Sequence, residues 1–96
     1  MNRFDSSVPE VKCTVTNKDE LNQIPSSVTH LEIASNCCNE SDLTELDLSH
    51  CLWLNRLVIG SNSLQNVTKI DAHNCVHLRE VIVGEGSLRM IQEYLR

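Results

Sequence analysis

Apolar residues recur along the chain at a fixed spacing of 24 positions. Segment 43–51 reads LTELDLSHC and segment 67–75 reads VTKIDAHNC, and their apolar positions coincide at this offset. The match continues without a gap to Leu64, which falls opposite Leu88. Self-similarity at such a period is typical of a solenoid, in which successive turns of the chain stack on one another.

Each 24-residue unit contains two copies of a shorter pattern, which reads apolar-x-x-apolar-x-apolar-x-x-(Asn/Cys). The fourth and sixth positions alternate with polar neighbours, as expected of a half-buried strand. Two strands in each unit predict two parallel sheets, one on each face of a flattened solenoid. The copies begin at Val28, Leu43, Leu54, Val67 and Leu78, and a weaker copy opens the chain with Val8, Val11, Cys13 and Thr16.

The ninth position of the pattern turns the chain out of each strand. We expect its side chain to lie inside and to bond backbone groups that the turn leaves unpaired. At the repeat spacing these positions fall into two columns, Cys51 with Cys75, and Asn36 with Asn62 and Gly86.

The cysteines divide by their place in the pattern. Cys13, Cys51 and Cys75 fall on inward or ninth positions, so we predict buried, reduced thiols. Cys37 and Cys38 follow Asn36 in a loop, where the pattern assigns them no structural role. We expect this pair to be exposed and open to oxidation.

The strand pattern resembles the leucine-rich-repeat superfamily, and within it the short-repeat BspA-like and FNIP-type members. The resemblance covers roughly residues 24–91 and is carried by IPSSVTHLEI at 24–33 and by the turns IGSNSL at 59–64 and VGEGSL at 83–88. Gly86 departs from the family pattern, which has Asn at that position, and the first coil is irregular. The resemblance implies recognition of a protein or ligand and supplies no catalytic residue.

The N-terminal part is predicted to form an irregular coil or cap over residues 1–27. Asn17 followed by Glu20 is a capping signal for a short helical turn, which Pro25 ends. Residues 28–86 hold the repeats, and the stretch from Asn36 to Asp42 is two residues longer than its later counterparts, which predicts a looser loop.

The C-terminal residues 87–96 are predicted to form a helical cap. Leu88, Ile91 and Leu95 have helical spacing, and Ser87 can serve as the N-cap. The whole chain is thus expected to be one mostly-β domain, a leucine-rich-repeat solenoid with two parallel sheets, 24-residue coils and short helical caps.

Charge and hydropathy exclude several kinds of partner. The formal net charge is −5 and the eight basic residues are scattered, which argues against nucleic acids and anionic membranes. No apolar run approaches the roughly 20 residues that cross a bilayer. Because residues 1–12 lack the apolar stretch of a signal peptide, we expect a cytoplasmic location, or an extracellular or surface location if a leader is missing.

The residues between the inward positions should face a partner. Glu45 beside Lys69 and Arg56 beside Glu80 would form opposite-charge pairs. A like pair of aspartates suggests either a basic partner or tolerated surface charge, and an outward apolar pair suggests either an anchor for a partner or simple β-propensity. The candidate binding residues are Glu45, Asp47, Lys69, Asp71, His73, Arg56, Val58, Glu80 and Ile82.

No motif predicts catalysis, a cofactor or a metal site. His50, His73 and His77 could be imagined around a zinc ion with Cys37 or Cys38, but no ligand spacing supports this. A His73–Cys75 nucleophilic pair is disfavoured because Cys75 should be buried.

The expected function is that of a non-catalytic protein–protein interaction module, whose partner is another protein. A self-associating structural subunit with edge-to-edge contacts, or a fragment of a BspA-like surface adhesin or effector, is the alternative.

Overall fold

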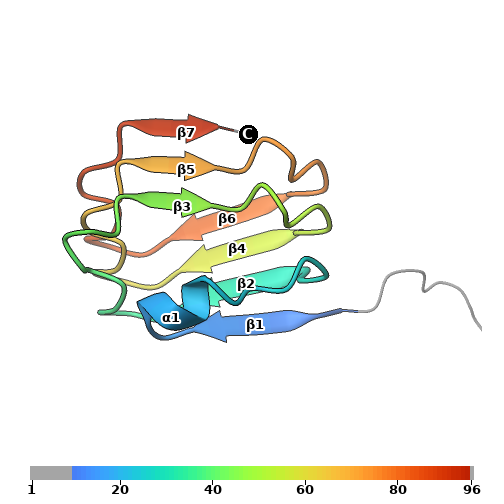
Figure 1. The fold of residues 1–96 in the computed structure, drawn as a ribbon, viewed down its shortest axis with the longest axis horizontal. Helices are drawn as coiled ribbons and strands as arrows, with labels where there is room; N and C mark the ends of the chain where they lie inside the picture. The colour runs from blue at the N-terminus through green and yellow to red at the C-terminus, as the bar shows by residue number, and fades with distance from the viewer. Residues whose placement is uncertain (1–9, 96) are drawn as a thin grey trace, which may run out of the picture.

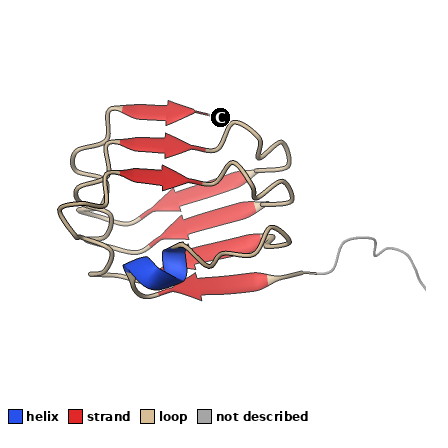
Figure 2. Ribbon diagram, in the orientation of Figure 1, coloured by secondary structure: helices blue, strands red, loops and turns tan. Residues whose placement is uncertain are grey.

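The computed structural model of the chain describes residues 10–95. Regular structure in this part is almost entirely β, with a single turn of helix, and the strands form two parallel sheets (Figure 1, Figure 2). The four-stranded sheet has the order β1-β2-β4-β6 and the three-stranded sheet the order β3-β5-β7. The elements are β1 (Lys12–Val15), α1 (Lys18–Leu21), β2 (His30–Ile33), β3 (Glu45–Asp47), β4 (Arg56–Ile59), β5 (Lys69–Asp71), β6 (Glu80–Val83) and β7 (Glu93–Leu95). Two parallel sheets were predicted, and this is confirmed.

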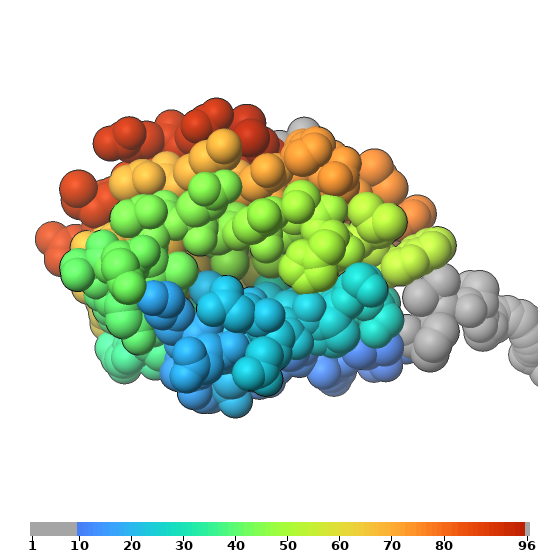
Figure 3. All heavy atoms as spheres, in the orientation of Figure 1, coloured from blue at the N-terminus to red at the C-terminus, as the bar shows by residue number. Residues whose placement is uncertain are grey.

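From β2 onward the chain changes sheet after every strand. The pairs β3–β5, β4–β6 and β5–β7 each join residues 24 positions apart, for example Arg56 with Glu80. The pair β2–β4 joins residues 26 positions apart, as in His30 with Arg56. The longer loop predicted between Asn36 and Asp42 accounts for the two additional residues. In Figure 3 the segments accordingly lie in bands, from the N-terminal blue to the C-terminal red.

One apolar core lies between the two sheets and draws on alternate residues of both. Leu31 and Leu57 point inward from the four-stranded sheet, and Leu46 and Ile70 from the three-stranded sheet. Leu31 is the register partner of Leu57, and Leu46 is that of Ile70, so equivalent inward side chains lie side by side on neighbouring strands. The core is made of aliphatic side chains and cysteines.

The predicted helical turn is confirmed as α1. The Asn17 side chain accepts a hydrogen bond from the Glu20 backbone N–H at 2.9 Å. The Glu20 carboxylate in turn accepts from the Thr16 backbone N–H and hydroxyl, both at 2.7 Å. This reciprocal capping satisfies N–H groups that a helix start leaves open.

The predicted helical cap over residues 87–96 is wrong. Residues 93–95 form β7, which pairs with β5, and Leu88 has a φ of 55°, in the left-handed region. A helix this short is marginal on its own, whereas a strand here gains hydrogen bonds to a preformed sheet edge. Ser87 is not an N-cap; its hydroxyl donates to the Gly60 carbonyl. Arg96 lies outside the described residues.

The register predicted for the first strand is wrong by two residues. Cys13 pairs with Leu31 and Val15 with Ile33, so the fourth and sixth positions of this copy are Cys13 and Val15, not Val11 and Cys13. A slip of two residues keeps the same side chains on the same face, and the pattern therefore could not detect it. Val8, which opened the predicted copy, lies outside the described residues.

The prediction that the column of Asn36, Asn62 and Gly86 points inward is wrong. Asn36 and Asn62 are exposed, and their φ angles are 58° and 57°, with 80° at Gly86. Asn and Gly are the residues that adopt left-handed backbone most readily. The column is therefore determined by backbone conformation.

The predicted burial of Cys51 and Cys75 is confirmed, and the Cys75 thiol lies 3.3 Å from the Leu48 carbonyl oxygen. The predicted exposure of Cys37 and Cys38 is wrong. Cys38 is buried in the core, and Cys37 is partly buried with its thiol 2.9 Å from the Ala34 carbonyl oxygen. All five cysteines are free thiols.

Within residues 10–95 no helix has the length and apolar character needed to cross a membrane.

Candidate interaction surfaces

The nine predicted binding residues lie on two separate surfaces. Four of them extend outward from the four-stranded sheet, and the others from the three-stranded sheet or the turn after it, with the core between. A partner that covers one face would therefore contact only one group. The first group is Arg56, Val58, Glu80 and Ile82, and the second is Glu45, Asp47, Lys69, Asp71 and His73.

The outer face of the four-stranded sheet is hollowed over β1, β2 and β4. The hollow has a volume of about 230 Å³, and its lining combines cationic, anionic and apolar groups. Val58 lies in it, half-buried, and pairs in register with the exposed Ile82. The lining residues are Lys12, Cys13, Thr14, His30, Leu31, Glu32, Arg56 and Val58. We call this surface the sheet hollow.

The predicted ion pair at the edge of the sheet hollow is confirmed. Arg56 Nε lies 3.2 Å from Glu80 Oε1, and about half of each side chain is exposed. Such a pair contributes little to stability in water. Glu45 and Lys69 are also in register on the other sheet, as predicted.

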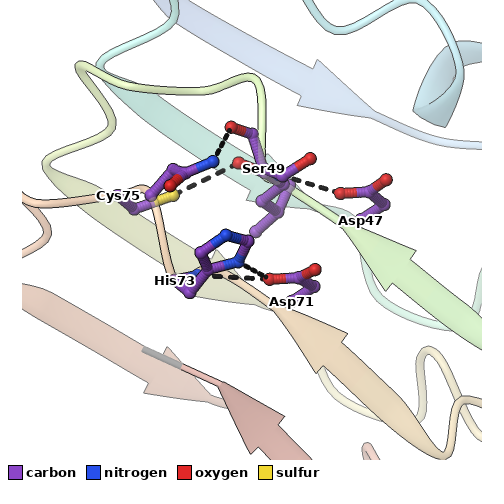
Figure 4. A network of polar contacts seen from close by, with 7 residues as sticks. Asp47, Ser49, Asp71, His73 and Cys75 are labelled. Atoms are coloured by element: carbon purple, nitrogen blue, oxygen red, sulfur yellow. Dashed lines mark hydrogen bonds and ion pairs between the residues drawn. The ribbon is translucent and has the colours of Figure 1, made fainter.

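On the three-stranded sheet the like-charged pair Asp47 and Asp71 is in register, and each carboxylate holds the turn that follows it (Figure 4). Asp47 Oδ1 accepts from the Ser49 backbone N–H at 2.9 Å. Asp71 Oδ1 accepts from the His73 backbone N–H at 3.3 Å and lies 2.5 Å from His73 Nδ1. The hydrogen bonds from Ser49 lower the pKa of Asp47, although the Asp71 charge opposes this. The His73 side chain lowers the pKa of Asp71. These aspartates thus have a local structural role, which weakens the interpretation that they attract a basic partner.

A third surface was missed by the sequence analysis. The rings of Trp53 and His77 are stacked, with centroids 5.1 Å apart and an angle of 5° between their planes. Leu52 and Val76, the preceding residues, are both exposed. The repeat offset of 24 places Trp53 opposite His77, so this pairing could have been predicted from the sequence repeat. We call these four residues, all in the turns before β4 and β6, the aromatic stack.

Beside the aromatic stack is a second hollow, also of about 230 Å³. Trp53 and His77 form part of its lining, and Glu10 and His30 contribute polar groups. His30 also lines the sheet hollow, so the two hollows are adjacent. The full lining is Glu10, Thr29, His30, Trp53, Asn55 and His77. We call it the Trp53 pocket.

The three histidines considered for a metal have different neighbours. His50 Nε2 lies 2.9 Å from the Ile24 carbonyl oxygen, His73 contacts Asp71, and His77 stacks on Trp53. In the described part of the chain, no three His, Cys, Asp or Glu side chains are grouped so that they could hold a metal ion. Burial raises the pKa of Cys51 to about 12, and the nearby Cys75 adds to this effect, so its thiolate is scarce at neutral pH.

Comparison of the chain with protein-family models, with curated proteins and with solved structures found no match in any of the three. We therefore base the functional proposal on the surfaces described above.

Proposed function

We propose that the chain is a leucine-rich-repeat solenoid with 24-residue coils, and that it works as a non-catalytic protein–protein interaction module. The alternation of strands between two parallel sheets and the register offset of 24 residues support this proposal. A stack of coils buries a continuous core and leaves broad strand faces available for contact. The partner is another protein.

The sheet hollow is the observation that carries the proposal. It is a concave surface with Lys12, Glu32 and Arg56 around the apolar Val58. A binding surface of this composition matches the usual anatomy of an interface, in which an apolar centre is surrounded by polar groups. Val58 and its neighbour Ile82 provide that centre, and an anchor in a hollow is where binding energy concentrates.

The test is a quantitative pull-down from the cells that make the protein. The bait proteins are the wild-type chain, a Val58→Glu/Ile82→Glu variant, and a control with Glu45→Lys/Lys69→Glu. The control keeps opposite charges side by side on the other sheet. Circular dichroism verifies that each variant is folded.

We expect at least one protein to bind the wild type and the control alike, and to lose at least about tenfold in binding to the Val58/Ile82 variant, the effect of a central anchor worth more than 1 kcal/mol. If the same proteins bind all three baits equally, the sheet hollow is not the binding surface.

A second function, self-association, is favoured by a specific observation at the C-terminal end. Val83 on β6 is 46% exposed, whereas Ile59, its partner on β4, is 1% exposed. Tyr94 on β7 is 40% exposed and its partner Ile70 on β5 is 3% exposed. Both β6 and β7 are last in their sheets. Open strand edges with apolar side chains readily pair with another chain.

We propose a second copy as the occupant of this edge, related by a two-fold axis. Antiparallel pairing of β6 with its copy, centred on Ile82, keeps inward residues inward. It also places Arg79 opposite Glu85 of the second copy, because the two are equally distant from Ile82 in sequence. Both residues are exposed, and opposite charges across strands are favourable.

Light scattering coupled to size-exclusion chromatography tests the self-association. We expect the wild-type mass to rise with concentration toward that of a dimer. Val83→Lys should abolish the rise, because an edge lysine blocks strand pairing, while Val76→Lys, at an exposed position in the aromatic stack, should not. A monomer mass at every concentration contradicts the proposal.

A further inference from the structure

The Trp53 pocket has an aromatic wall and an acidic group. Trp53 is 48% exposed although His77 is stacked on it, so the indole ring has surface left for another group. Glu10 lines the same pocket, and more than half of its side chain is exposed. An exposed indole is uncommon and is the side chain most often found as an energetic centre of an interface.

The charges of the pocket favour a cation. Among the described residues 10–95, Glu10 is the only carboxylate that lines it, and no lysine or arginine of this part of the chain does. Glu10 Oε2 lies 3.4 Å from His30 Nε2, beyond the length of a good hydrogen bond. Its acceptor capacity is therefore only partly used. The negative edge of the pocket and the π-face of Trp53 attract the same kind of group, because a cation above an indole ring is stabilised by the ring quadrupole.

We propose that the Trp53 pocket binds an arginine side chain of the partner protein. The inference rests on the proposed interaction function and adds a chemical requirement to it. A partner segment that covers the sheet hollow can reach the pocket at His30, which lines both.

Arginine fits this pocket better than lysine does. The guanidinium group is planar, so it can stack on the indole ring, and its donors form a fork that matches a carboxylate. Asn55 in the lining carries an amide oxygen that can accept a further hydrogen bond. A lysine ammonium would meet the charge of Glu10 but could not stack.

The experiment is a titration of the folded chain with N-acetyl-arginine amide, at a pH of about 8, where free imidazole is neutral. N-acetyl-citrulline amide, which has nearly the same shape and no charge, and N-acetyl-lysine amide are the comparison ligands. Trp53 is the only tryptophan, so its fluorescence and the NMR signal of its indole N–H report on the pocket directly. A single side chain should bind with a Kd on the order of 1–10 mM.

We expect the arginine derivative to shift the Trp53 signal at concentrations where the citrulline derivative does not, with lysine about 3- to 10-fold weaker. Glu10→Gln should weaken arginine binding by about 3- to 10-fold, whereas Glu93→Gln, which makes the same charge change at an exposed position of the other sheet, should not alter it. In the wild type the NMR signal of the Asn55 side-chain amide should also shift on arginine binding, and in Trp53→Leu this shift should disappear.

Equal shifts with arginine and citrulline, or arginine binding that is the same in Glu10→Gln and the wild type, would overturn the inference. Such a result leaves the proposed interaction function standing if the Val58/Ile82 variant still loses its partner in the pull-down. If arginine binding also fails these tests while the Val58/Ile82 variant keeps its partner in the pull-down, both proposals are contradicted.

Discussion

At the scale of single residues, backbone conformation explains positions that polarity does not. The column of Asn36, Asn62 and Gly86 has left-handed φ angles at all three positions, from 57° to 80°. A residue with a bulky or branched side chain would be strained there by roughly 1–2 kcal/mol. Cys38 and Leu88 also have left-handed φ angles, 58° and 55°, and Cys38 is nevertheless buried, with 3% of its surface exposed.

Burial should make two of the thiols inert. It raises the pKa of Cys38 and of Cys51 from 9.0 to about 12. The thiolate, which is the reactive form, should therefore be scarcer by about three orders of magnitude than in an unfolded chain. At pH 8 we expect alkylation by iodoacetamide, followed by peptide mass spectrometry, to leave both residues unlabelled while the protein is folded.

Addition of denaturant serves as the control, since it should make both thiols react at the rate of a model peptide. Rapid native labelling of Cys38 would show that the loop after Asn36 opens readily.

At the scale of elements, a column of small polar side chains ties the loops after β2, β4 and β6 together. The Ser63 hydroxyl donates to the Ala34 carbonyl at 2.5 Å, and the Ser63 backbone N–H donates to the Ser87 hydroxyl at 2.9 Å. Cys37 occupies the equivalent place in the loop after β2, with its thiol directed at the same Ala34 carbonyl. Successive loops are thus hydrogen-bonded to one another at the point where the chain leaves the four-stranded sheet.

Ser63→Ala should lower the free energy of unfolding by about 1–3 kcal/mol, because it removes the buried hydroxyl that donates to the Ala34 carbonyl. Ser63→Cys keeps a weak donor and should cost less. The exposed Ser26→Ala is the control and should stay within about 0.5 kcal/mol of wild type. Urea denaturation measures all three, and an unchanged Ser63→Ala would mean that the column is dispensable.

At the scale of the whole molecule, the two faces of each sheet should differ sharply in their tolerance of substitution. Side chains of the core are enclosed by both sheets, whereas the outer faces carry charges in water. The core also ends asymmetrically. Leu21 and Ile24, in and after α1, are buried at the N-terminal side, while apolar residues of β6 and β7 remain exposed.

Leu57→Ala, which empties space at a fully buried position, should cost about 2–5 kcal/mol. Glu45→Ala, on the outer face, should change the free energy of unfolding by less than about 0.5 kcal/mol. Chemical denaturation at equal protein concentration measures both. Similar losses in the two variants would contradict the assigned facing.

Several features of the fold were predictable because they depend on local periodicity. Alternation at period two determines which side chains of a strand share a face. The offset of 24 alone predicts that Glu45 pairs with Lys69 and Arg56 with Glu80, as the structure shows. The Asn17 cap is equally local. The Trp53 pocket was not predictable in this way, since Glu10 and His77 meet there from distant parts of the chain.

The sequence by itself thus determined the strand faces, the parallel pairing and the buried Cys51 and Cys75. Only the tertiary structure decided that residues 93–95 form a strand, that Cys13 and Val15 are the partners of Leu31 and Ile33, and that Cys38 is buried. The physical reason is that periodicity records which face of the backbone is apolar, and it is the same after a slip of two residues. Which neighbour accepts the backbone hydrogen bonds depends on the sheet edge that the rest of the chain provides.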